Sequence, residues 1–181
     1  MRVFLTAGEA SGDRLGAALM AGLRRLSPDV SLAGIGGPEM GAAGLRSLFP
    51  MEELSVMGIA EVLPRLRRLL ARIDETARRV AEERPDVLVT IDSPDFSLRV
   101  ARRVRAMAPG IPIVHYVAPS VWAWRPGRAR RLRGRVDRVL ALLPFEPPYL
   151  EDAGVPCTFV GHPVVAEPVA TPAEASAFRD T

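Results

Sequence analysis

The feature that most constrains the fold is a regular alternation between short, wholly apolar segments and longer amphipathic ones. Segments 3–5, 87–91 and 113–117 carry apolar side chains at most positions instead of at every second one. A strand of this kind must be covered on both faces, as in a parallel sheet between two layers of helices. The alternation therefore predicts an α/β fold, with a doubly wound, mostly parallel sheet in a Rossmann-like domain.

The amphipathic segments have the apolar spacing of helices. Pro64 is expected either to kink the helix in which it falls or to start its main segment. Residues 1–165 are long enough to bury a core and are expected to form one domain. The predicted strands are 3–5, 31–35, 87–91, 113–117, 139–143 and 158–160, and the predicted helices are 13–26, 59–83, 96–108 and 125–135.

The end of the chain differs in composition. Proline, alanine and glutamate dominate residues 166–175, which is typical of a linker. Thr171 followed by Glu174 is a capping-box pattern for a helix that starts near Ala173. We therefore expect residues 166–181 to be a linker and the start of a helix that leads to a further domain outside this chain.

Composition excludes several classes of protein. Of the 181 residues, 48% are apolar and 25% are charged, which indicates a globular protein and not a disordered one. The single cysteine, Cys157, excludes an intrachain disulfide and is expected to be a buried, inert thiol. With only two histidines and no cysteine–histidine cluster, a structural zinc site is not expected. No signal-peptide pattern and no apolar stretch of roughly 20 residues is present, so a cytoplasmic protein is expected.

Positive charge is unevenly placed along the chain. The net charge is +3, and all 24 basic residues are arginines. They cluster in 65–72, 99–105 and 125–138, which indicates contact with phosphate or an anionic surface, or else ordinary solvated helix faces. No aromatic residue interleaves 128–135, and no RNA- or DNA-binding motif frames it, so no nucleic-acid partner is expected.

Two glycine-rich loops follow the first two strands. In the first loop, 7–16, Glu9 and Ala10 occupy the critical positions of a dinucleotide fingerprint, and the Glu9 carboxylate would repel a pyrophosphate. A hydroxyl-rich polar ligand fits better, although Ser11 or Asp13 could instead cap the helix. The second loop, 34–40, contains Gly36 and would line the same crevice.

Asp92 directly follows the third strand. Open α/β sheets bind ligands beyond the carboxyl ends of their strands, so Asp92 is placed to take a proton from a hydroxyl. Asp95 is expected to cap the helix that Pro94 opens. The alternative is that both carboxylates are caps.

A fourth group of candidates lies in 115–125. His115 falls within a strand and could be a hydrogen-bonded core histidine. Both tryptophans of the chain lie in this segment. Aromatic rings stack on sugars or acyl chains, and arginine pairs with phosphate, although packing also accounts for a tryptophan. The substrate-binding candidates of this segment are His115, Ser120, Trp122 and Arg125.

A basic amphipathic stripe runs along the predicted helix 59–83. Apolar side chains share one face with arginines around it, which is typical of a helix on an anionic membrane surface and also of an ordinary packed helix. The candidate membrane contacts are Val62, Leu63, Leu66, Leu69 and Leu70.

Seven short motifs occur in order over nearly the whole chain: AGEASGD, GIGGPEM, MEELSVMGIAEVL, IDSPDF, HYVAPSVWAWR, LLPFE and FVGHP. Together they resemble the lipid-A-disaccharide synthase family, which comprises inverting glycosyltransferases with the two-domain GT-B fold. The resemblance implies that 1–165 is the acceptor-side domain and that the missing domain holds the nucleotide sugar. It also implies that this fragment is inactive alone.

The resemblance further implies the reaction. The donor would be UDP-2,3-diacylglucosamine and the acceptor 2,3-diacylglucosamine 1-phosphate (lipid X), giving the β-1,6-linked disaccharide 1-phosphate and UDP without a cofactor. Asp92 would be the base, Glu9, Ser11 and Asp13 would orient hydroxyls, and Arg125 would contact phosphate. The protein would associate peripherally with the inner membrane, and a homodimer of the full-length protein is left open.

Two alternatives remain at this stage. One is another GT-B enzyme, either a different UDP-sugar transferase or an epimerase. The other is a non-catalytic domain that binds membranes.

Overall fold

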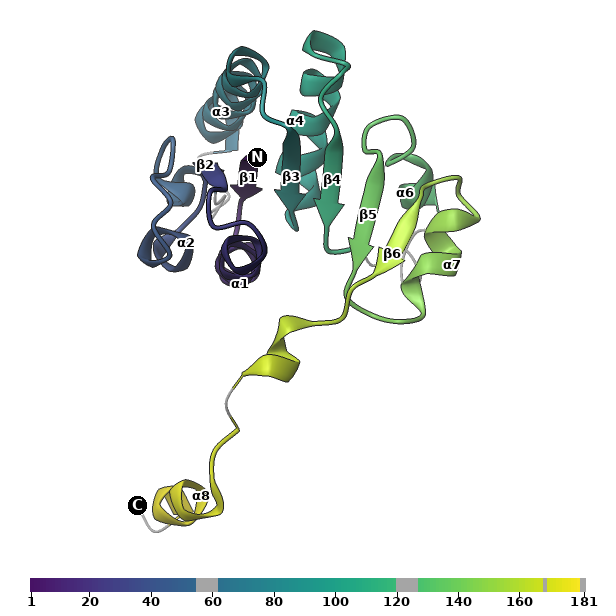
Figure 1. Cartoon of the computed structure of the whole chain (residues 1–181). Helices are drawn as coiled ribbons and strands as arrows, with labels where there is room; N and C mark the ends of the chain where they lie inside the picture. The colour runs from purple at the N-terminus through teal and green to yellow at the C-terminus, as the bar shows by residue number, and fades with distance from the viewer. Residues whose placement is uncertain (55–61, 120–126, 168, 180–181) are drawn as a thin grey trace.

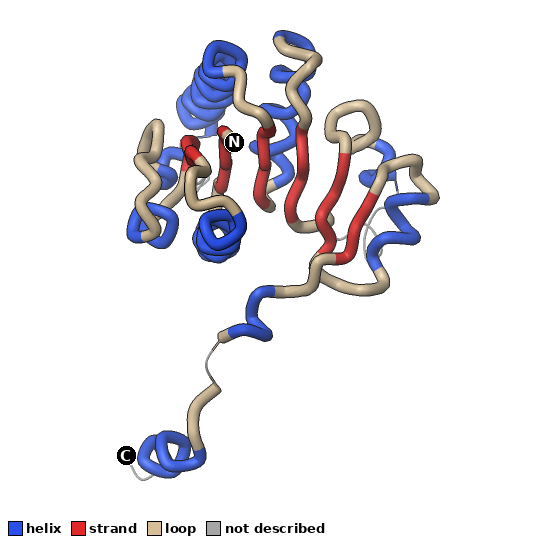
Figure 2. Tube along the Cα trace, viewed as in Figure 1, coloured by secondary structure: helices blue, strands red, loops and turns tan. Residues whose placement is uncertain are grey.

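The computed structural model describes residues 1–54, 62–119, 127–167 and 169–179. Its centre is a single parallel sheet of six strands in the order β2-β1-β3-β4-β5-β6, and this confirms the predicted doubly wound α/β architecture (Figures 1 and 2). The strands are β1 (Arg2–Ala7), β2 (Ser31–Ile35), β3 (Val87–Ile91), β4 (Ile113–Tyr116), β5 (Arg138–Ala141) and β6 (Cys157–Phe159).

Helices cover both faces of the sheet. Helices α1 and α2 pack on one face, and α3, α4, α6 and α7 pack on the other (Figure 1). The helices are α1 (Ala10–Leu26), α2 (Pro38–Ala42), α3 (Val62–Glu83), α4 (Pro94–Met107), α6 (Gly127–Arg130), α7 (Glu146–Glu151) and α8 (Pro172–Arg179), with 3-10 turns at Met51–Leu54 and Pro163–Ala166.

The apolar runs form strands because both of their faces are buried. In β1, every residue from Val3 to Ala7 is buried, with odd positions facing α1 and Phe4 facing α3 and α4. Cys157 also lies in the core, and burial raises the pKa of its thiol to about 11. A thiol with that pKa is almost entirely protonated near neutral pH, which confirms the expected buried and unreactive cysteine.

The order of the strands places the topological switch point of the sheet between β1 and β3. The chain crosses from β1 to β2 on one side and returns to β3 on the other, so the loops after β1 and β3 diverge from neighbouring strand ends. Ala7 pairs with Ile91 at the carboxyl ends of these strands. The residues that follow each of them, the glycine loop and Asp92, must therefore lie side by side.

One predicted helix is shorter in the structure, one of the two roles predicted for Pro64 is confirmed, and one helix was not predicted. The expected helix 125–135 is shorter, because α6 ends at Arg130 and a turn with Gly134 at φ +73° follows. Helix α3 begins at Val62, so Pro64 stands in its first turn, where a missing N–H costs nothing. Helix α7 was not predicted, because its two prolines read as a loop although they occupy its first turn.

The predicted capping box at the end of the chain is confirmed. Thr171 Oγ1 accepts a hydrogen bond from the Glu174 N–H, and the Glu174 carboxylate accepts one from the Thr171 N–H at 2.7 Å. The bond from the Thr171 N–H, and a second one that the Thr171 hydroxyl donates to the same carboxylate at 2.8 Å, lower the pKa of Glu174. No residue of α8 is buried, and Figure 1 shows the helix lying apart from the sheet.

Candidate active site

Two serine–carboxylate hydrogen bonds join the loops after β1 and β3. Ser11 Oγ donates to Asp92 Oδ2 at 2.8 Å, and Ser93 Oγ donates to Glu9 Oε1 at 2.7 Å. Each loop thus supplies one hydroxyl and one carboxylate to the other. The two carboxylates that the sequence singled out, Glu9 and Asp92, are brought together at the carboxyl end of the sheet, where open α/β sheets bind ligands.

Asp92 is fixed by its backbone as well as by Ser11. Its N–H donates to the Tyr116 carbonyl at 2.9 Å, and its own carbonyl accepts from Ser97 Oγ at 2.7 Å. The side chain is half-buried, and Oδ1 has no hydrogen-bond partner among the described residues. One carboxylate oxygen is therefore held in place while the other is available to a ligand, which is the arrangement that a general base needs.

Backbone strain concentrates at this edge of the sheet. Asp92 and Ser93 have φ values of +49° and +46°, and Val117, which directly follows β4, has φ +82°. Aspartate tolerates the left-handed region, but a β-branched valine there is an outlier that costs about 1–3 kcal/mol. Strained residues at the ends of two adjacent strands mark this edge as a functional region.

Gly8 permits the close approach of the two loops. A Cβ at Gly8 would stand 2.8 Å from Ser93 Oγ, the atom that binds Glu9. Any larger residue would push Ser93 away, so the glycine of the AGEASGD motif is explained by a packing requirement at the site.

Ser93, and not Asp95, is the N-cap residue of α4, so the expected cap is corrected. Ser93 has no side-chain bond to the helix, since its hydroxyl is committed to Glu9. Its role was missed because a serine between Asp92 and Pro94 reads as a turn residue. Its position just after Asp92, at the end of a buried strand, was the sequence feature that could have identified Ser93 as part of the site.

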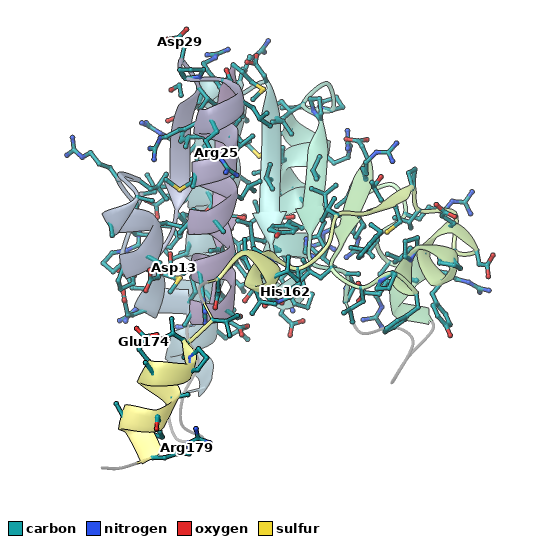
Figure 3. The ribbon with its side chains drawn as sticks, turned by 60° about the horizontal axis from the view of Figure 1, so that its bottom comes forward. Asp13, Arg25, Asp29, His162, Glu174 and Arg179 are labelled. Carbon is teal, nitrogen blue, oxygen red and sulfur yellow. The ribbon has the colours of Figure 1, made fainter. Side chains whose placement is uncertain are left out.

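The structure corrects the expected role of Asp13. This residue is only 1% exposed, and its carboxylate accepts three backbone N–H bonds, from Gly37 (2.7 Å), Glu39 (2.9 Å) and Met40 (3.0 Å). Figure 3 shows it on α1 beside α2. Asp13 therefore holds the loop after β2 and the start of α2, and it is too deeply buried to orient a sugar hydroxyl.

Gly36 also serves the structure of that loop. Its N–H donates to Ser47 Oγ at 3.2 Å, and a Cβ there would stand 2.7 Å from atoms of Met40. Because the N–H already has a partner and the residue is buried, Gly36 is not the ligand contact that the sequence suggested.

His115 is a core histidine. It is 1% exposed, and its Nδ1 lies 2.8 Å from Thr90 Oγ1 on the neighbouring strand. Burial lowers its pKa to about 4, against a smaller opposite effect of the Asp92 carboxylate. His115 is therefore neutral near pH 7, and it lies beneath the site instead of touching a substrate.

A family model described as lipid-A-disaccharide synthetase matches residues 3–180. The chain belongs to this family. It is 65% identical over 179 residues to the lipid-A-disaccharide synthase of Ruegeria pomeroyi, and the match covers 99% of this chain and 44% of that protein. The corresponding protein of Rhodospirillum centenum is 58% identical over 164 residues, covering 90% and 41%. The chain thus spans less than half the length of these relatives.

Solved structures place this member of the lipid-A-disaccharide synthetase family in the GT-B fold. The outer core galactosyltransferase WaaB superposes with a TM-score of 0.58 at 13% identity, covering 90% of this chain and 46% of that one. Anabaena Alr3699/HepE, solved with UDP and glucose, also gives 0.58 at 13% identity, covering 99% and 49%. The chain has a Rossmann-like fold that matches about half of each of these chains.

Several candidate site residues within the lipid-A-disaccharide synthetase motifs lie outside the residues that the structure describes. Ser120, Trp122 and Arg125 fall in 120–126, outside the described residues, and so do the side chains of Val62 and Leu63. The other residues of the predicted membrane stripe differ in how exposed their side chains are. Leu66 is 41% exposed, whereas Leu69 and Leu70 are half-buried and pack against the core.

The described parts of this family member contain no group of three or more histidine, cysteine, aspartate or glutamate side chains that could hold a metal ion. Within the same residues, no helix is long and apolar enough to cross a membrane.

Proposed function

We propose that this chain is the acceptor-side domain, residues 1–165, of a lipid-A-disaccharide synthase. The full-length enzyme would join UDP-2,3-diacylglucosamine to 2,3-diacylglucosamine 1-phosphate. The observation that carries the proposal is the fixed carboxylate of Asp92 at the switch point of a GT-B domain, in a chain that belongs to the lipid-A-disaccharide synthetase family. Residues 166–181 would lead to the domain that binds the nucleotide sugar.

Asp92 is the general base in this proposal. Its Oδ1 accepts the proton of the acceptor 6-hydroxyl while Ser11 holds Oδ2. The hydroxyl oxygen then forms a bond to the anomeric carbon of the donor from the side opposite to UDP. The bond between that carbon and the UDP oxygen breaks, and its electron pair leaves with UDP. Attack from the opposite side inverts the anomeric centre and gives the β linkage.

Glu9 and Ser11 orient the acceptor sugar. Glu9 is exposed at the start of α1 with one carboxylate oxygen bound to Ser93, so its other oxygen can accept from a sugar hydroxyl. The acidic pair suits a neutral, hydroxyl-rich ring and disfavours a pyrophosphate, which supports placement of the nucleotide on the other domain.

The site of action in this proposal is the cytoplasmic surface of the inner membrane, because both substrates carry acyl chains. Leu66 is exposed on α3 beside the exposed arginines Arg67 and Arg68. An exposed leucine among arginines suits a helix that touches an anionic bilayer surface.

The test is a transplant into the Ruegeria pomeroyi relative, whose matched segment this chain would replace over 179 residues. The chimera, the relative and this chain alone are assayed for disaccharide 1-phosphate formed from the two acylated sugars. We expect product from the chimera and the relative and none from the chain alone. A folded chimera that makes no product would overturn the proposal, and product from the chain alone would overturn the division of labour between domains.

A further inference from the structure

A basic pocket lies between α4 and the turn that follows α6. Both elements pack on the face of the sheet opposite to α1 (Figure 1). Its volume is about 350 Å³. The α4 side contributes Arg99 and Arg102, and the turn contributes Arg131 and Arg135. The other lining residues are Pro94, Asp95, Leu98 and Pro119.

Among the described residues, no ion pair neutralises the arginines of this pocket. The ion pairs between described residues include Arg103 with Asp74 and Arg105 with Asp137, but they include none of the four pocket arginines. Asp95 is the only carboxylate among the described lining residues, and it lies one helical turn from Arg99. Four arginines against one aspartate leave a local charge of +3.

The pocket arginines repel one another. The pKa of Arg135 is lowered, first by burial and then by the positive charges of Arg102 and Arg131. Holding like charges together without a counter-charge costs stability. An anion bound between them would remove that cost, and arginine forks match the oxygens of a phosphate.

The pocket adjoins the candidate base. Pro94, in its lining, is two residues beyond Asp92, so their Cα atoms lie within about 7.6 Å of each other. A sugar 1-phosphate carries its phosphate on C1, across the ring oxygen from C6. A sugar whose 6-hydroxyl lies at Asp92 can therefore direct its phosphate toward α4.

We propose that Arg99, Arg102, Arg131 and Arg135 form the binding site for the 1-phosphate of the acceptor sugar. The inference rests on the proposed function and deepens it, because it assigns the acceptor to a position between this pocket and Asp92. The four guanidinium groups neutralise the phosphate and fix which end of the sugar faces the base.

Binding is measured first, on this chain, by calorimetry with glucosamine 1-phosphate, glucosamine and inorganic phosphate. The variant is R102Q/R135Q, and the control is R25Q/R78Q, which removes the same charge from exposed positions on α1 and α3. We expect glucosamine 1-phosphate to bind the wild type and the control, to be displaced by inorganic phosphate, and to bind the variant at least tenfold more weakly. A second pair, R99Q/R131Q, also removes one arginine from each side of the pocket and should weaken binding in the same way.

Equal affinity of glucosamine 1-phosphate for the folded pocket variants and the control would overturn the proposal. So would binding of unphosphorylated glucosamine with the same affinity. Vesicles of phosphatidylglycerol distinguish a lipid headgroup from a sugar phosphate. If R102Q/R135Q lost vesicle binding but kept its affinity for glucosamine 1-phosphate, the pocket would be a membrane contact and the proposal would be wrong.

Kinetics in the chimera separate this inference from the proposed function. R102Q/R135Q should raise the KM for the acceptor at least tenfold, with kcat and the donor KM changed less than twofold. R102K/R135K, which keeps the charge, should recover part of the loss. If the chimera is active and R102Q/R135Q does not change its acceptor KM, only the proposal for the pocket is overturned. If the chimera itself is inactive, the proposed function is overturned, and the binding measurement still tests the pocket.

Discussion

The hydroxyl of Ser11 donates to Asp92 Oδ2 at 2.8 Å, although the two residues are 81 positions apart in the sequence. The bond can form because β1 and β3 are neighbours in the sheet, so the residues that follow the two strands start side by side. Beyond these residues the two loops diverge toward opposite faces of the sheet. It leaves Oδ1 of Asp92 open at the edge where substrate is expected.

Replacing Asp92 by asparagine should lower kcat in the chimera by about 10²- to 10⁴-fold, because a positioned base contributes that much and an amide cannot take the proton. The acceptor KM should change little. Steady-state rates with both acylated sugars are the measurement, with circular dichroism to verify folding.

The matched control for this change is Asp29→Asn, which removes one carboxylate at the opposite end of α1 from Asp13 (Figure 3). Its kinetics should equal those of the wild type. Near-normal turnover by a folded Asp92→Asn protein would exclude Asp92 as the base.

Replacing Ser11 by alanine should have a smaller effect than removing Asp92. The carboxylate would keep its backbone anchors but lose the hydroxyl that fixes its orientation, a loss of about 1 kcal/mol, or roughly fivefold in kcat. The double variant with Asp92→Asn should be no slower than Asp92→Asn alone. Additive losses would show that Ser11 acts independently of Asp92.

Asp13→Asn should destabilise the fold by about 2–4 kcal/mol. An asparagine side chain has one acceptor oxygen and one NH₂ donor, whereas both oxygens of the Asp13 carboxylate accept from backbone N–H groups. At least one of these buried N–H groups would therefore lose its acceptor. Urea unfolding is the measurement. Glu39→Gln, in the same loop but exposed, should change stability by less than about 0.5 kcal/mol. Comparable effects of both substitutions would refute the bracing role of Asp13.

His115 should make the protein less stable in mild acid. Folding lowers its pKa from 6.5 to about 4, so between these values the unfolded chain binds more protons than the folded one. Protonation thus favours unfolding, and the free energy of unfolding should fall by about 2 kcal/mol from pH 7 to pH 5 through this residue.

The measurement is urea unfolding at several pH values for the wild type and for His115→Asn, which keeps a partner for Thr90. The asparagine variant should lack this part of the pH dependence, since it has no group that titrates there. Identical slopes in the two proteins would show that His115 is not the group responsible.

Leu66→Ser should weaken binding to phosphatidylglycerol vesicles by about tenfold, because one exposed leucine would no longer enter the bilayer. Leu69 is unsuitable for this test, since it packs against the core. Leu26→Ser is the control, because Leu26 is 87% exposed at the end of α1. If both variants pellet with vesicles as the wild type does, the α3 stripe is not a membrane contact.

The sequence by itself determined the order and type of most elements, because short apolar runs rich in β-branched residues favour strands covered on both faces. It also placed Asp92 at the edge where ligands bind, since that position depends only on where a strand ends. The capping box of Thr171 and Glu174 was equally predictable, since both residues lie within one helical turn.

Only the tertiary structure decided which polar residues face a ligand. Asp13 and Ser93 have partners 24–27 and 84 residues away, and His115 is neutral because the sheet and helices bury it. The basic pocket is also a tertiary feature, since α4 and the turn after α6 bring arginines from two separate clusters together. Sequence spacing reports local periodicity, whereas burial and long-range hydrogen bonds depend on how the elements pack, and at this site they decide which side chains remain free for chemistry.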